Sequence, residues 1–324
     1  MSEPTALPTP DARLRLATAA ALAGADVITP LPLRALAVTG ADALTFLQGQ
    51  VTTDMREVTP AQSRLGCLLN LKGRIQASFR VLAIADGFLL VLPADQFEPA
   101  RLRLAKYAVF SKVTLAERPL RIRGVLGGHA LARLQAAGWT WPDAAQQVAT
   151  RADALLARLP GDQRALLLEP AGSDAGERED DTPDAAALAA WHCAAVAAGE
   201  LLLPQEASER WQPQEMDYHQ LQGVSYQKGC YLGQEIVARL YFRGQLKTAL
   251  TRLRADWPSD AGDAGLAPGQ DIRAGERGVG EIVSVAWPDA AHVELLALLR
   301  QDAESPTVQA AGRDLALSIL PFTR

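Results

Sequence analysis

Cysteine is scarce in this chain, and the three thiols lie far apart in the sequence: Cys67, Cys193 and Cys230. No two of them form a CxxC pair, so one copy of the chain cannot supply the four cysteines of an iron–sulfur or zinc site. Histidines are equally few and lack the spacing of metal ligands: His129, His192, His219 and His292. We therefore predict no resident metal, and an odd number of thiols favours a reducing compartment over secretion.

Long apolar runs are also missing, since none approaches the roughly 18–20 residues that span a bilayer. Arg13 and Arg15 precede an alanine-rich stretch, 16–25, that resembles a weak signal peptide. The acidic Glu3 and Asp11 before it, and its low leucine content, favour an N-terminal helix instead. We therefore expect a cytoplasmic protein without membrane contact.

Positive charge is not in excess, because 32 Lys and Arg stand against 37 Asp and Glu. The net charge of -5 disfavours bulk binding to a nucleic-acid backbone, and we expect no direct nucleic-acid partner. Four common motifs are absent: GxxxxGKS/T, HExxH, GxSxG and a GxGxxG after a strand. Their absence argues against P-loop nucleotide hydrolases, zinc proteases, α/β-hydrolases and Rossmann dehydrogenases. We expect a monomer.

Local patterns predict a strand, a hairpin and helices in an order typical of an α+β layer. The predicted strands cover 33–39, 67–70, 75–84, 88–92 and about 109–115. Asp42 is expected to cap a short helix that ends near 48–50, and Asp95 to open a helix that reaches Tyr107.

The second half of the chain changes character. Residues 169–182 are acidic and predict a solvated loop, followed by a helix from Thr182-Pro183 to about Ala198 that Gly199 ends. Short apolar segments separated by Gly, Pro and Asp then predict a β-barrel. We predict two regions, 1–245 with two intertwined α+β modules and 246–324 as the barrel.

The segment around Cys230 carries the clearest chemical pattern. Gly229 permits an unusual turn, and a helix is predicted from Tyr231 onward. Cys230 would then lie at a helix N-terminus, two residues after Lys228, and both features favour thiolate over thiol. The alternative is a buried cysteine that packs as a small hydrophobe, which local sequence alone supports about equally.

The octapeptide 228–235 matches the K-G-C-F/Y-x-G-Q-E signature of the YgfZ-type folate-binding proteins. These proteins are relatives of the glycine-cleavage aminomethyltransferase and are linked to assembly and repair of iron–sulfur proteins. Segments 39–54, 70–74 and 106–112 resemble three further motifs of that family, so the resemblance covers nearly the whole chain.

The resemblance implies an aminomethyltransferase-like α+β fold of three modules around a central hole, with tetrahydrofolate or a one-carbon derivative as ligand. It implies that Trp191 stacks on the folate, although a tryptophan packed in the core is the rival interpretation. Cys230 would be the working thiol, with Lys228 beside it. The other candidate folate-binding residues lie in the motifs: Gln50, Thr53, Asp54, Lys72, Arg74, Tyr231, Gln234 and Glu235.

Lysines add modest support, because four of only five fall inside these motifs and the fifth is Lys247. An ammonium suits a point contact to a carboxylate, so some lysines are candidates for the glutamate tail of a folate. The alternative is that they are ordinary surface lysines.

Some features of true aminomethyltransferases are missing. Residues 72–85 contain no carboxylate, with Ala77-Ser78 where the resemblance places the catalytic one. A pterin-binding glutamate is missing near Ala197, with Glu206 or Glu215 as possible substitutes, and an aromatic is missing near Leu33. Enzymatic activity is therefore left open.

Three functions fit these observations. The first is a folate-dependent accessory factor whose partners are iron–sulfur client or assembly proteins, including tRNA-modifying cluster enzymes. The second is a folate-dependent methyl- or aminomethyl-transferase that uses Cys230. The third is a binding module in which folate is structural.

Overall fold

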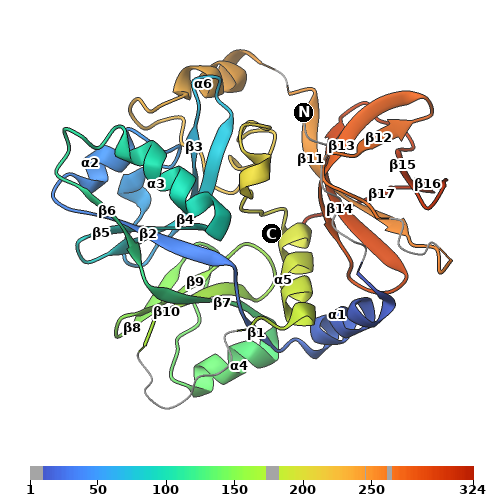
Figure 1. Ribbon diagram of the computed structural model, residues 1–324, viewed down its shortest axis with the longest axis horizontal. Coiled ribbons are helices and arrows are strands. Elements are labelled where there is room, and N and C mark those ends of the chain that lie inside the picture. The colour runs from blue at the N-terminus through green and yellow to red at the C-terminus, as the bar shows by residue number, and fades with distance from the viewer. Residues whose placement is uncertain (1–9, 173–181, 245, 261–264) are drawn as a thin grey trace.

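The computed structural model describes residues 10–172, 182–244, 246–260 and 265–324, which form three β-sheets with helices between them (Figure 1). The first sheet is antiparallel, in the order β3-β4-β5-β2-β6. Its strands are β2 (Leu33–Thr39), β3 (Arg64–Leu69), β4 (Ile75–Ile84), β5 (Gly87–Pro93) and β6 (Thr114–Arg118). Alternate residues of β2 face opposite sides: Leu36 and Val38 pack under α2 (Ala43–Gln48) and α3 (Phe97–Ala105).

The other face of this sheet packs against a second five-stranded sheet in the order β1-β7-β10-β9-β8. Its strands are β1 (Val27–Pro30), β7 (Leu120–Leu126), β8 (Val148–Arg151), β9 (Ala154–Arg158) and β10 (Arg164–Pro170). Ala35 and Ala37 of β2 share a core with Ile122 of β7 and Leu166 of β10. The second sheet is covered on its outer side by α4 (Gly128–Ala136) and Trp139.

The third sheet has seven strands in the order β16-β15-β12-β13-β14-β11-β17 and curls into a half-barrel around its own core. Its strands are β11 (Thr248–Asp256), β12 (Asp271–Ala274), β13 (Arg277–Ala286), β14 (His292–Arg300), β15 (Thr307–Ala310), β16 (Arg313–Ala316) and β17 (Ser318–Leu320). Trp257 and Trp287 meet edge to face in this core, with ring centroids 4.5 Å apart. No helix among the described residues is long and apolar enough to cross a bilayer.

The centre of the molecule is occupied by α5 (Ala185–Ala198) and by the long segment 200–233 that follows it (Figure 1). Helix α5 packs on α1 (Ala12–Gly24) and on the half-barrel. The segment after it has little regular structure, yet it buries Trp211, Met216 and Tyr218 against Cys67 and Cys193. This segment connects all three sheets.

Most elements predicted from the sequence are confirmed. The α+β class, the strands 33–39 and 75–84, the alanine-rich helix ended by Gly199 and the β character of the C-terminal region all agree with the structure. The division into regions 1–245 and 246–324 stays a prediction; it places the boundary between α6 (Gln234–Arg243) and β11.

Other local predictions were wrong. Residues 109–113 form a loop, because β6 begins only at Thr114. Glu169 belongs to β10, where it pairs with Arg123, so the acidic loop begins later than predicted; residues 173–181 lie outside the described part of the chain. Helix α6 begins at Gln234 rather than Tyr231.

Candidate functional site

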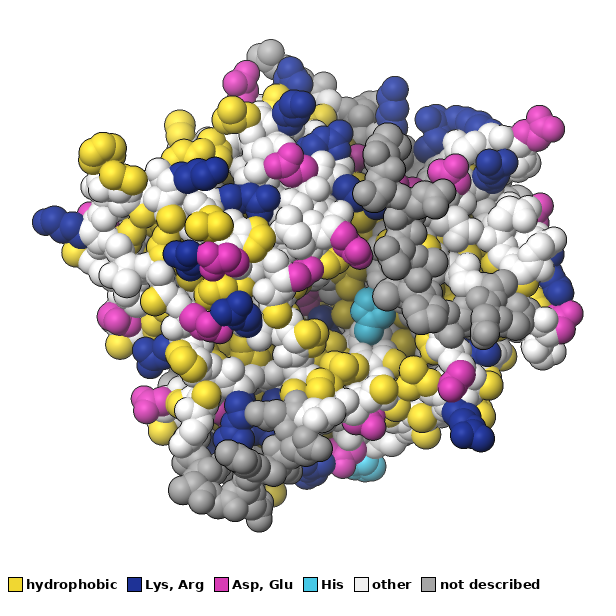
Figure 2. Space-filling view, in the orientation of Figure 1, with side chains coloured by type: hydrophobic (Ala, Val, Ile, Leu, Met, Phe, Trp, Pro, Cys, Tyr) yellow, Lys and Arg dark blue, Asp and Glu magenta, His cyan; other side chains and the backbone are white. Residues whose placement is uncertain are grey.

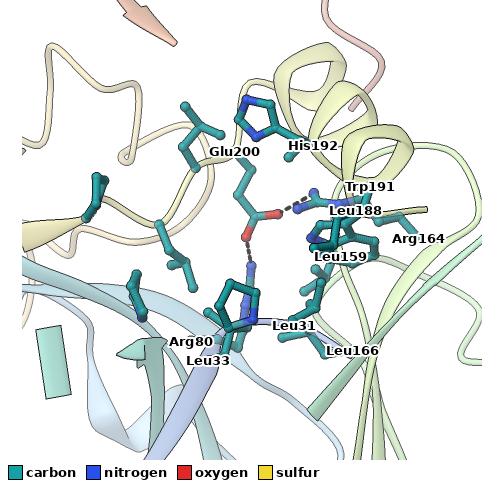
Figure 3. Close-up of a pocket in the computed structure, with 16 residues that line it drawn as sticks. Leu31, Leu33, Arg80, Leu159, Arg164, Leu166, Leu188, Trp191, His192 and Glu200 are labelled. Atoms are coloured by element: carbon teal, nitrogen blue, oxygen red, sulfur yellow. Dashed lines mark hydrogen bonds and ion pairs between the residues drawn. The ribbon is translucent and has the colours of Figure 1, made fainter. Parts of the chain in front are cut away.

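A cavity of about 360 Å³ lies where the two five-stranded sheets meet α5 and the start of the 200–233 segment (Figure 3). Its apolar lining comes from both sheets and from the chain around α5: Leu31, Pro32, Leu33, Pro93, Leu159, Leu166, Leu188, Ala195, Leu201, Leu202 and Pro204. Its polar lining consists of Arg80, Arg164, His192 and Glu200, and Trp191 completes the wall. Mostly apolar lining with a few converging polar groups is typical of small-molecule sites.

Trp191 is held in this wall by a glycine on the neighbouring sheet. A Cβ placed on Gly124 of β7 would lie 2.7 Å from the Trp191 ring, so only glycine leaves room for the ring at this distance. The Arg164 guanidinium lies 4.6 Å from the ring centroid. Trp191 therefore lines this cavity, and its stacking on a folate stays a prediction.

A buried carboxylate bridges the two sheets inside the cavity. Glu200 accepts from Arg80 of β4 through Oε1 and from Arg164 of β10 through Oε2, the latter at 3.0 Å (Figure 3). All three side chains are nearly inaccessible to solvent. Because one carboxylate faces two guanidinium groups, the bridge carries a net positive charge.

His192 contributes a neutral imidazole to the lining. Burial lowers the pKa of this ring, so it is uncharged near pH 7. Its Nε2 lies 3.1 Å from the Val285 carbonyl, which only accepts, and 3.0 Å from Ser284 Oγ, which can accept or donate. The carbonyl favours the tautomer with the proton on Nε2. Nδ1 is then left as an acceptor that has no partner among the described residues.

The structure shows what occupies two positions where the sequence lacks a residue of true aminomethyltransferases. Ser78 of β4 is buried, and its Oγ accepts from the Leu203 amide, so no carboxylate stands there. Leu33 lines the cavity, where it supplies an aliphatic wall instead of an aromatic one. Neither Glu206 nor Glu215 lines the cavity; Glu200 is the carboxylate that does.

The Cys230 octapeptide forms a second locus, outside the lining of this cavity. Its loop is fixed by Lys228, whose Nζ donates to the carbonyls of Val51 and Thr53 at 2.7 and 2.6 Å. The Ser225 amide donates to the Thr52 carbonyl at 2.9 Å, which ties the loop to the same segment. The octapeptide loop thus packs directly on the end of the 39–54 motif.

The 70–74 motif packs on the same loop from the other side. Gly233 adopts φ +80°, and a Cβ there would lie 2.6 Å from the Asn70 carbonyl oxygen. This left-handed residue is the N-cap of α6, so the helix cannot extend back to Cys230. Cys230 therefore lies on a loop, and the expected helix N-terminus beside the thiol was wrong.

Cys230 is nevertheless the accessible thiol of this chain. Its side chain is exposed, whereas Cys67 and Cys193 are buried. Burial raises the pKa of each of those two thiols to about 12, which keeps them protonated. The alternative of a buried, packing cysteine at position 230 does not hold.

The other predicted folate-binding residues surround this loop rather than the cavity, whose lining includes none of them. Thr53 and Asp54 are buried, and Arg56 and Gln48 hold the pKa of the Asp54 carboxyl far below its usual value despite that burial. Tyr231 is buried with its ring 5.0 Å from Lys228 Nζ, and its amide donates to Gln234 Oε1. Gln50 is partly exposed, and three others are exposed: Lys72, Arg74 and Glu235.

Sequence reasoning missed Arg80, Arg164, His192 and Glu200. One signal was available for Arg80, since a cation in the middle of the apolar run 77–84 has to find a buried partner. The partner, Glu200, lies 120 residues away in sequence, and no local pattern links the two. Within the described residues, no group of three or more His, Cys, Asp or Glu side chains lies close enough to hold a metal ion.

Lys228 gives a testable pH dependence. Burial lowers its pKa to about 7, well below that of the unfolded chain, so between about pH 7 and 10.5 the unfolded state binds more protons. The free energy of unfolding should therefore rise with pH across this window relative to Lys228→Met. Urea denaturation of both proteins at several pH values measures the difference, and parallel pH profiles would contradict the buried, depressed lysine.

No family model matches the chain. The "tRNA-modifying protein YgfZ" of Shigella boydii serotype 18 is 31% identical over 299 residues, covering 88% of this chain and 90% of that protein. The protein of the same name from Escherichia coli O157:H7 is 30% identical with the same coverage. The chain belongs to the YgfZ family.

The fold agrees with a second comparison. The aminomethyltransferase T of the glycine cleavage system from Bartonella henselae superposes with a TM-score of 0.74 over 97% of this chain and 92% of that one. The two sequences are only 18% identical, so this likeness concerns the fold alone. A YgfZ protein with an aminomethyltransferase-like fold is what the sequence resemblance predicted.

Proposed function

We propose that this YgfZ protein binds a reduced folate in the Trp191 cavity and acts as an accessory factor for iron–sulfur proteins, including tRNA-modifying cluster enzymes. Its working thiol is Cys230. The observation that carries the folate assignment is the cavity itself, which offers an aromatic wall and converging polar groups in a fold shared with an aminomethyltransferase.

The residues present fit a pterin ring. A volume of about 360 Å³ lies within the range of roughly 300–1,000 Å³ usual for small-molecule sites. Trp191 brings an aromatic ring to a lining that is otherwise mostly aliphatic, which suits the flat, largely apolar faces of a pterin. Glu200 is already engaged by two arginines, so it orients those donors rather than reading the ligand directly.

His192 supplies the acceptor that a pterin requires. A pterin carries ring N–H and amino donors, and each buried donor needs a partner on the protein. Because the Val285 carbonyl holds the Nε2 proton, Nδ1 keeps its lone pair available for such a donor. His192 would therefore take over the role of the missing pterin-binding glutamate.

A pair of variants separates the two ring nitrogens of His192. The side-chain amide of an asparagine reaches about as far from the backbone as the Nδ1 atom of a histidine. The amide of a glutamine reaches about as far as the Nε2 atom. We expect His192→Gln to weaken tetrahydrofolate binding about tenfold, and His192→Asn to retain affinity within about threefold. Isothermal titration of both variants decides the matter, and equal affinities would remove His192 from ligand recognition.

The accessory role rests on Cys230. The exposed thiol projects from a loop that is anchored by Lys228, so we assign Lys228 to positioning the loop rather than to chemistry at the sulfur. A thiolate is a soft metal ligand and a nucleophile, and either property would serve a client cluster or a one-carbon adduct. One cysteine cannot hold a cluster alone, so any ligation needs a partner.

The rival function, a one-carbon transferase, has less support. Such an enzyme needs a general acid or base near the folate, and Ser78 stands where the aminomethyltransferase carboxylate is expected. The carboxylate that lines the cavity, Glu200, is neutralised by two guanidinium groups. Turnover of methylene-tetrahydrofolate by the purified protein would favour the transferase.

A further inference from the structure

A group of exposed apolar side chains is left unexplained by the cavity and by Cys230. Among the described residues, large apolar side chains on and around α2, α3 and the 70–74 turn are open to solvent: Leu44, Leu71, Leu102, Tyr107, Val109 and Phe110. Phe110 is 99% exposed and Leu71 78% exposed. Single exposed hydrophobic residues are ordinary, but a group of this kind marks an interaction site.

Contacts between their segments bring the parts of the chain that carry these side chains next to one another. The Lys112 amide donates to Asp42 Oδ2 at 2.7 Å, which joins the 106–113 loop to the start of α2. Arg103 near the end of α3 donates to the Gln76 carbonyl of β4, two residues beyond the 70–74 turn. Figure 2 shows apolar side chains interspersed with basic and some acidic ones over the region where Figure 1 places α2, α3 and α6.

The charges among these side chains are mostly positive. Lys72, Lys106 and Lys112 are exposed, and the structure gives none of them an ion pair within the described residues. They lie in a chain whose net charge is -5, so the cations are concentrated against an acidic background. We call the six apolar side chains and these three lysines the basic–apolar face.

We propose that the basic–apolar face docks an acidic protein that carries apolar side chains of its own. Tyr107 and Phe110 beside the lysines suit base stacking as well as a protein, but the aliphatic Leu44, Leu71 and Val109 gain only from another apolar surface. The aliphatic side chains therefore favour a protein over a nucleic acid. A twofold dimer through this face would oppose the lysines of two copies. Charge complementarity therefore favours a different, negatively charged protein.

The face adjoins the working thiol. The Leu232 amide donates to the Gly49 carbonyl at the end of α2, so the Cys230 loop borders the segment that carries Leu44. A docked partner would be held next to the exposed Cys230. The identity of the partner as a client rests on the proposed function, but the test below measures docking alone and uses neither folate nor cluster-enzyme activity.

The test places a photo-crosslinking residue at Val109, which is 73% exposed, in the full chain expressed in its own host cells. We expect a nuclease-resistant adduct with a protein of net negative charge. Its yield should fall at least tenfold in Phe110→Ser and in Lys106→Glu/Lys112→Glu. The partner, once purified, should bind the chain less tightly as salt concentration rises.

Two variants on the half-barrel serve as matched controls. Ile319→Ser and Lys247→Glu make the same kinds of change at exposed positions away from the face, and both should leave the adduct unchanged. All the changed side chains are exposed, so equal melting temperatures are expected. A nuclease-sensitive adduct, an adduct of two copies of this chain, no adduct, or equal loss in the controls would each overturn the proposal.

Discussion

Cys230→Ser is expected to abolish support of iron–sulfur enzymes while leaving the protein folded. The side chain is exposed, so the change should cost about 1 kcal/mol or less of the free energy of unfolding. A serine hydroxyl is neither a soft metal ligand nor a nucleophile at neutral pH. The measurement is complementation of an Escherichia coli strain that lacks its relative of this chain, read as the modification level of tRNA made by cluster enzymes.

The two other cysteines provide the controls. Cys67 lies 3.4 Å from Thr52 Oγ1 in the core, and Cys193 is buried on α5. Their serine variants should complement, with a lower melting temperature where the hydroxyl disturbs packing. Full complementation by Cys230→Ser at normal expression would show that the sulfur chemistry is wrong and that the motif is structural.

Loss of the Glu200 carboxylate is expected to have the largest effect on stability. In Glu200→Leu, Arg80 and Arg164 would remain buried without a counter-charge between the two sheets. Breaking a buried ion bridge in this way typically costs about 3–5 kcal/mol, which is a large share of the stability of a domain. Chemical denaturation measures the loss directly.

An exposed ion pair gives the matched comparison. Glu98 pairs with Arg101 on the surface of α3, and Glu98→Leu should change the free energy of unfolding by less than about 1 kcal/mol. If Glu200→Leu is no more destabilising than Glu98→Leu, the buried bridge does not hold the sheets together.

The sequence was informative wherever the determinants of structure are local. Strand β4 was predicted with the bounds that the structure shows, since the Ala85-Asp86-Gly87 turn that follows it is a local signal and needs no distant partner to be recognised. The end of α5 at Gly199 was predicted for the same reason, because a left-handed C-cap favours glycine.

Predictions that depend on distant contacts were less successful. The start of α6 was misplaced because the turn at Gly233 is set by the Asn70 carbonyl, which comes from another strand connection. The motif residues were expected in the ligand cavity. Instead, Lys228 Nζ donates to the Thr53 carbonyl at a separate locus. A motif shows that residues act together, but not which cavity they line.

The cavity could be predicted only in part. Trp191 lines the cavity, and the resemblance to the family singled it out, whereas local sequence alone supported a packed core tryptophan about equally. His192 follows it directly in sequence, but its role depends on the Val285 carbonyl of the half-barrel, which fixes the ring proton. A contact of this kind, between α5 and the half-barrel, cannot be recognised from the sequence before the three sheets are assembled.

Tetrahydrofolate binding to the Trp191 cavity tests the account most directly. Isothermal titration of the full-length protein should show saturable binding to one site, accompanied by a change in tryptophan fluorescence. Trp191→Ala should weaken that binding at least tenfold, whereas Trp141→Phe, which alters a ring near Arg158 outside the cavity, should not. Absence of saturable binding to the wild-type chain, or equal affinity in Trp191→Ala, would contradict the proposed function.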